Sequence, residues 1–191
     1  KMKTVVIYNS QTGFTKRYAQ WIAKASGARC LAFSEAKTKN LDAFEAIIFG
    51  SWACAGRIRG LGWFKKQAGR WHGKKLIVFC VGANPPESPD IAPALQLNFT
   101  ESELKKIRVF YCPGGLNYKK MSVPSRLMMK LFLTALKLKK GKTKAEQEVI
   151  KAVSSSYDIS DKKYIRPVLE CLKQKSVTGG ITTDYVPSQK L

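Results

Sequence analysis

The chain has 191 residues, 45% of them hydrophobic and 25% charged, which is enough for one globular domain with a core of its own. Thirty-four Lys and Arg against thirteen Asp and Glu leave a net charge of +21, so we expect anionic partners or substrates. The sequence has no run of about 20 apolar residues and no signal-peptide pattern, which argues against a transmembrane helix and a leader. Five scattered cysteines without a C-x-x-C pair argue against a disulfide framework and a metal site, and fit reduced thiols in a cytoplasmic protein.

Short apolar runs alternate with segments of helical spacing along the chain. The runs predict five buried strands, at residues 4–8, 28–33, 46–50, 76–81 and 107–112. Helical spacing predicts a first helix that ends at Gly27, a second at 61–71 and a last one at 161–173. Because strands and helices alternate and the strands are almost continuously apolar, we expect an α/β fold with a doubly wound parallel sheet. We expect a single domain over residues 1–175 and assign no structure to the tail, 176–191.

The turn after the first strand is rich in hydroxyl side chains and contains one glycine. Its residues are Ser10, Gln11, Thr12, Gly13, Phe14 and Thr15. At this position the unpaired N–H groups of a helix N-terminus can bind a phosphate, and glycine allows the backbone to turn closely around it. The alternative is a turn that only caps the helix. The position directly after the first buried strand favours phosphate binding.

This turn resembles the phosphate loop of flavodoxins, whose pattern Ser/Thr-x-Thr-Gly-x-Thr is matched at Ser10, Thr12, Gly13 and Thr15. The resemblance implies a flavodoxin-like five-stranded parallel sheet of order 2-1-3-4-5 with FMN as cofactor. Residues 47–57 and 114–118, followed by a basic apolar helix, resemble the flavodoxin-like, quinone-dependent protoporphyrinogen oxidases of bacteria. By element order, that similarity extends to Lys173.

The flavodoxin resemblance implies that the flavin ring lies among three loops at the strand ends. The implied contacts are Ser51, Trp52, Ala53 and Cys54 in the first loop, Gly82, Ala83 and Asn84 in the second, and Gly114, Gly115, Leu116 and Tyr118 in the third. Trp52 would stack on the ring or be a core aromatic at a strand end, and Tyr118 would face the substrate or anchor the following helix. Cys54 and Ala55 stand where the oxidases have an Arg-Tyr pair, which weakens the transfer of their substrate specificity.

Residues 119–144 form a basic apolar segment that a simple flavodoxin does not need. Pro124 suits the first turn of a helix, and an apolar surface that includes Leu127, Leu131 and Phe132 follows, with lysines around it. Such a helix would lie in the interface of an anionic membrane or pack on the domain with its lysines reaching water. The oxidase resemblance favours peripheral membrane contact of a cytoplasmic protein.

We therefore expect an FMN-dependent oxidoreductase that passes electrons from a small reduced substrate, with a porphyrinogen favoured, to a quinone or an acidic redox protein. One alternative is a flavodoxin-type electron carrier without a substrate of its own. A second is a non-enzymatic module that binds anions or nucleic acid. Specific nucleic-acid binding is not expected, because the basic helix lacks the interleaved aromatic residues of single-strand binders.

Overall fold

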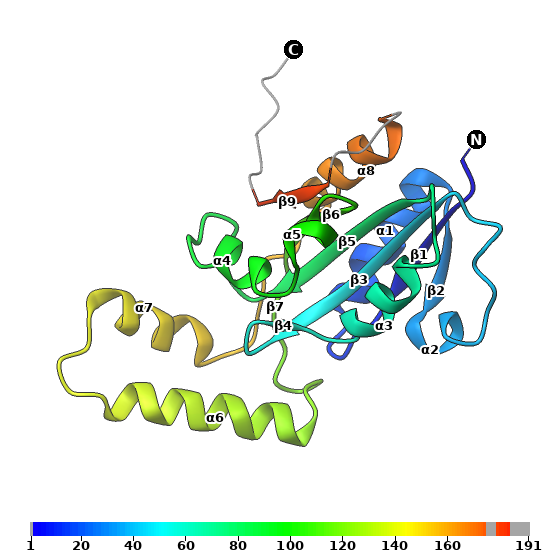
Figure 1. Ribbon diagram of the computed structural model, residues 1–191. Coiled ribbons are helices and arrows are strands. Elements are labelled where there is room, and N and C mark those ends of the chain that lie inside the picture. The colour runs from blue at the N-terminus through cyan, green and yellow to red at the C-terminus, as the bar shows by residue number, and fades with distance from the viewer. Residues whose placement is uncertain (1, 175–178, 184–191) are drawn as a thin grey trace, which may run out of the picture.

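The computed structural model describes residues 2–174 and 179–183, which fold around one central sheet (Figure 1). In the described part of the chain this sheet has seven strands, in the order β2-β1-β3-β5-β6-β9, with β4 paired only to β3. All pairs except β3–β4 are parallel. The strands are β1 (Thr4–Tyr8), β2 (Arg29–Ala32), β3 (Ala46–Cys54), β4 (Arg57–Ile58), β5 (Lys75–Gly82), β6 (Ile107–Pro113) and β9 (Gly180–Thr182).

Helices cover both faces of the sheet. The first layer consists of α1 (Phe14–Ser26), the 3₁₀ helix η1 (Lys162–Ile165) and α8 (Arg166–Lys173). The second layer consists of α2 (Phe33–Ala36), α3 (Leu61–Ala68), α4 (Ile91–Gln96) and α5 (Glu101–Leu104). The fold is therefore the doubly wound α/β arrangement that the alternating pattern predicts, and the five predicted strands take the predicted order.

Burial on both faces explains why the strands are almost continuously apolar. In β1, Val5 and Ile7 pack into the core on one side of the sheet, whereas Val6 packs into the core on the other side. The same alternation occurs in β3, where Phe49 and Ile48 lie in opposite cores. Because neither face meets water, polar residues have no favoured position inside these strands.

The third strand differs from the prediction. It was expected to end at Gly50, yet β3 continues to Cys54 and pairs with β4 through a turn at Ala55 and Gly56, both with positive φ (49° and 75°). Gly50 is needed within the strand, because a Cβ there would lie 1.9 Å from the Phe79 ring on β5. The glycine marks close packing rather than a strand end, so residues 51–54 are strand and not loop.

Smaller differences concern short elements. The second strand ends at Ala32, since Phe33 begins α2, and the last helix begins as a 3₁₀ turn. The β9 strand lies in the segment 176–191, to which we assigned no structure, and pairs with β6. Residues 176–178 and 184–191 of that segment are outside the described residues. A three-residue strand has too few positions for its periodicity to be recognised.

The basic segment forms two helices that project from the sheet (Figure 1). They are α6 (Val123–Leu138) and α7 (Lys144–Val153), whereas one helix within 119–144 was expected. We call residues 119–154 the insertion. It is framed by a two-stranded antiparallel sheet of β7 (Gly115–Leu116) and β8 (Tyr157–Asp158). No residue of either helix is buried, and no helix among the described residues has both the length and the apolar character that crossing a bilayer requires.

Candidate functional site

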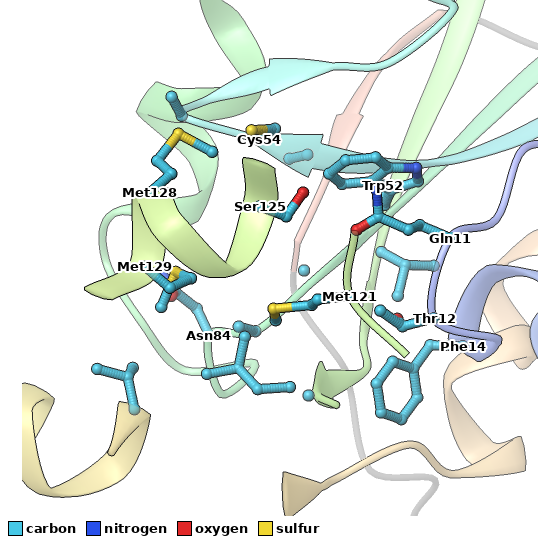
Figure 2. A pocket seen from close by; sticks show the side chains of 18 of the residues that line it. Gln11, Thr12, Phe14, Trp52, Cys54, Asn84, Met121, Ser125, Met128 and Met129 are labelled. Carbon is cyan, nitrogen blue, oxygen red and sulfur yellow. The ribbon is translucent and has the colours of Figure 1, made fainter. Parts of the chain in front are cut away.

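A cavity of about 520 Å³ lies at the carboxyl ends of β1, β3 and β5, where parallel α/β sheets bind their ligands (Figure 2). Its walls come from both the sheet domain and the insertion. The predicted site residues that line it are Gln11, Thr12, Phe14, Thr15, Trp52, Ala53, Cys54, Gly82, Ala83, Asn84, Gly115 and Leu116. Ser10, Gly13, Ser51, Gly114 and Tyr118 are not among the lining residues, and each has another place in the structure.

The turn between β1 and α1 has the geometry of an anion-binding loop. Gly13 is the N-cap of α1 with a φ of 101°, a conformation that side-chain-bearing residues rarely adopt. Its amide donates a hydrogen bond to Ser10 Oγ over 3.2 Å, which closes the turn and explains the role of Ser10. Nothing among the described residues accepts a hydrogen bond from the amides of Thr12, Phe14 and Thr15. These amides are available to an anion at the positive end of the helix dipole.

The end of β3 forms one wall of the cavity. Trp52, Ala53 and Cys54 line it before the tight turn into β4. The Arg59 guanidinium lies 5.7 Å from the centroid of the Trp52 ring, a cation–π contact that helps to hold the indole in place. Figure 2 shows Trp52 among the side chains that line the cavity. Ser51 is fully buried and donates to the Arg59 carbonyl over 2.5 Å, so its hydroxyl supports this wall rather than lining it.

The loop after β5 is held by two tyrosine hydroxyls. Tyr111 donates to the Asn84 carbonyl over 2.8 Å, and Tyr157 donates to the Ala83 carbonyl over 2.7 Å. Burial raises the pKa of both phenols, so they stay protonated donors to higher pH than an exposed tyrosine does. Tyr111 belongs to β6 and Tyr157 to β8. Because they bond the carbonyls of this loop, these two strands help to set the shape of the loop.

The third predicted loop divides into lining and supporting residues. Gly115 and Leu116 line the cavity from β7. Gly114 lies beneath it, where an added Cβ would meet Val81 at 2.6 Å and Phe14 at 3.2 Å.

Tyr118 lies outside the cavity. Its amide donates to Ser156 Oγ over 3.0 Å, and its hydroxyl donates to the carbonyl of Val153. These bonds join Tyr118 to the end of α7 and to Ser156, and not to the following helix α6 that it was suggested to anchor.

The insertion supplies a roof that our reading of the strand ends missed. Thioether and other apolar side chains of the insertion face the loops across the cavity, and Figure 2 shows Met121, Met128 and Met129 among them. The insertion residues that line the cavity are Met121, Ser125, Met128, Met129, Phe132, Val149 and Val153. Three methionines in nine residues are a signal for an adaptable binding surface, but the sequence did not indicate which side of α6 faces the domain.

A family model described as a flavodoxin domain matches residues 5–146, which span the sheet, the cavity loops and α6. The chain belongs to the flavodoxin domain family. Membership implies a flavin cofactor, and the residues present fit one. The loop from Ser10 to Thr15 offers free amides to a phosphate, the lining contains no charged side chain among the described residues, and the cavity volume falls in the usual range for cofactor sites, about 300–1,000 Å³.

Solved flavodoxin structures resemble the chain at low sequence identity. An archaeal flavodoxin shares 18% identity with a TM-score of 0.39, covering 81% of this chain and 100% of that one. A flavodoxin, WrbA-like protein from Agrobacterium tumefaciens shares 21% with a TM-score of 0.38, covering 81% and 96%. The Trp repressor binding protein from Bacillus subtilis shares 17% with a TM-score of 0.43, covering 73% and 100%. A comparison with curated proteins gives no match.

Proposed function

We propose that the protein is an FMN-dependent oxidoreductase whose own substrate binds beneath the insertion. One observation carries this proposal: free amides of the phosphate loop open onto an apolar cavity that the insertion roofs. A carrier that only exchanges electrons with protein partners needs no such roof. The electron-carrier alternative is therefore the weaker candidate.

In this proposal each wall has a separate task. The amides of Thr12, Phe14 and Thr15 hold the phosphate, and Trp52 flanks the ring. The loop 82–84, held by Tyr111 and Tyr157, orients the ring edge. The methionines of α6 exclude water and adapt to the substrate. FMN, when bound, supplies the redox chemistry.

We propose a porphyrinogen as the substrate class and a quinone as the acceptor. An uncharged cavity wall suits a large, mainly apolar molecule, and the net charge of +21 attracts its carboxylates. The resemblance of residues 47–57 and 114–118 to the flavodoxin-like protoporphyrinogen oxidases supports the same class. Cys54 and Ala55 replace the Arg-Tyr pair. Cys54 is the last residue of β3, Ala55 begins the turn into β4, and both line the cavity that the insertion roofs, so we expect substrate specificity to differ from those enzymes at these two positions.

The test is a titration of purified protein with FMN, followed by flavin fluorescence, and then addition of protoporphyrinogen and a quinone. Saturable quenching with quinone-dependent turnover would support the whole proposal. Quenching without turnover of porphyrinogen would overturn the substrate class and favour the electron carrier. Absence of quenching would overturn the cofactor and with it the proposed function.

We further propose that the outer side of α6 contacts an anionic membrane. Val123, Leu127, Leu131 and Leu138 expose between 55% and 76% of their surface there. Lys or Arg stands at nine positions from 119 to 144, and Asp or Glu at none. Apolar side chains surrounded by cations are the features by which helices lie in the interface of anionic bilayers, each nearby cation contributing about 1 kcal/mol.

Co-sedimentation with vesicles tests this contact. Wild-type protein should pellet with phosphatidylglycerol vesicles and much less with phosphatidylcholine vesicles. Leu131→Ser should weaken that binding at least about threefold, because it removes apolar area from the interface. Leu97→Ser is the matched control, since Leu97 is 72% exposed but lies outside the insertion. Equal losses in both variants would contradict the assignment to α6.

A further inference from the structure

A lysine of the insertion lies directly over the phosphate loop. The Lys120 ammonium is 3.9 Å from the position that a Cβ on Gly13 would occupy. With Thr12, Gly13 and Lys16 it lines a second cavity of about 480 Å³ on the side of the loop that faces α1 and β8. No other atom of the described residues, apart from the chain neighbours of Gly13, lies within 4 Å of that position.

The Lys120 charge is not neutralised by a neighbour. Within the described ranges its ammonium has no ion pair and no hydrogen bond. Asp158 is the acidic residue of the second cavity, but Arg17 already bonds its carboxylate over 2.5 Å. That pairing, together with a bond from Ser160, holds the pKa of Asp158 below its usual range although burial alone would raise it. Lys120 therefore faces the loop as an uncompensated cation.

Local bonds fix the turn that carries Lys120. Its backbone amide donates to the carbonyl oxygen and to Oδ1 of Asn117, over 3.1 and 3.2 Å. Two residues later, Ser122 caps α6 and accepts a hydrogen bond from Gln11 Nε2 over 3.2 Å. Because Gln11 belongs to the phosphate loop, the start of the insertion is tied to the loop two residues after Lys120. The backbone of Lys120 is thus held by the hydrogen bonds of the turn, which limits where its side chain can reach.

We propose that Lys120 binds the phosphate of the flavin, so that the insertion supplies a cation to a loop whose own residues, 10–15, carry no charge. The inference rests on the proposed function and assigns a binding residue to its site. A charge-assisted bond from an ammonium is stronger than one from a neutral donor. Two consequences follow: the protein should distinguish FMN from riboflavin, which lacks the phosphate, and the distinction should depend on the insertion.

The test compares dissociation constants for FMN and riboflavin by fluorescence quenching in wild type, Lys120→Ala, Lys120→Arg and Lys119→Ala. Lys119 is the matched control, because it is the neighbouring exposed lysine and lines neither cavity. Lys120→Ala should weaken FMN binding about tenfold, the size expected for one lost bond to a charged group, and leave riboflavin binding unchanged. Lys120→Arg should keep most of the affinity and Lys119→Ala all of it. The salt dependence of FMN binding should also be shallower in Lys120→Ala.

Two results would overturn the inference and leave the proposed function standing. One is FMN binding that is as tight in Lys120→Ala as in wild type. The other is an equal loss for FMN and riboflavin, which would indicate a structural defect rather than a lost phosphate contact. A wild-type protein that binds neither flavin would overturn the proposed function itself.

Discussion

The sheet domain and the insertion are stabilised in different ways, although both line one cavity. In the sheet domain, large side chains such as Phe49, Phe64 and Phe79 are completely buried, and Phe49 stacks on Phe64 with ring centroids 5.4 Å apart. In the insertion, no residue of α6 or α7 is buried. The polar contacts that tie it to its surroundings include Gln11–Ser122 and the bond from the Tyr118 hydroxyl to the Val153 carbonyl.

This difference separates the part that positions the cofactor from the part that covers it. The phosphate loop is fixed by a strand and a helix that contribute to a continuous core. The two helices of the roof contribute no buried residue to that core. We expect substitutions in the two regions to affect different measurements.

The largest expected effect comes from matched substitutions of phenylalanine. Phe49→Ala should lower the free energy of unfolding by about 3–5 kcal/mol, because it leaves a cavity in the core beside Phe64. Phe132→Ala, at a side chain that is 46% exposed, should change it by less than about 0.5 kcal/mol. Urea denaturation of the two variants measures both values. Similar losses would mean that the insertion is part of the cooperative core.

The second prediction concerns the phosphate loop. Thr12→Glu should weaken FMN binding by more than about a hundredfold, since the carboxylate would repel the phosphate and occupy its space. Thr12→Ser keeps the hydroxyl and is the control, with affinity close to wild type. Flavin fluorescence titration gives both constants. Unchanged affinity in Thr12→Glu would place the phosphate elsewhere.

The third prediction tests how the insertion is attached. Tyr118→Phe removes the hydroxyl that bonds the Val153 carbonyl at the end of α7 and should destabilise the insertion by about 1 kcal/mol. Trypsin should then cleave the lysine-rich segment 130–144 several times faster, while FMN affinity stays within about twofold. If FMN affinity fell as much as in Thr12→Glu, Tyr118 would act on the cofactor site and not as an anchor.

The smallest effect is expected from the Arg17–Asp158 pair, which joins α1 to β8. Because the Asp158 pKa is lowered in the folded protein, its contribution is complete above the usual pKa of an aspartate and is lost as pH falls through the folded-state value. Both side chains are more than 40% exposed, so the contribution should be below about 1 kcal/mol. Thermal melts of wild type and Asp158→Asn should differ at pH 6 and converge in acid. A difference that persists in acid would contradict an ionic origin.

Sequence reasoning worked where function follows from local order along the chain. Thr12 and Gly13 stand between a strand and a helix, and Trp52 and Gly82 lie near strand ends, so their common edge follows from parallel topology alone.

Gly50 was misread as a strand end, because the need for glycine came from Phe79 on the neighbouring strand. Met121 and Val149 could not be assigned to the cavity, because their place depends on where the projecting insertion lies relative to the strand ends. Tyr118 matched a family pattern, but its hydrogen bond to Val153 involves a helix that the sequence did not predict.

Positions 119–144 contain nine Lys or Arg residues and no acidic residue, so this part of the folded chain is a dense polycation. Its lysines repel one another, and Lys139 reaches its carboxylate partner only in α7, at Glu146, over 2.5 Å. Counter-ions in solution must therefore supply much of the missing negative charge, and their concentration sets how strongly the segment repels itself within a Debye length of about 8–10 Å. We therefore expect the ionic composition of the buffer to affect the conformation of the insertion, which roofs the cavity, much more than that of the sheet domain.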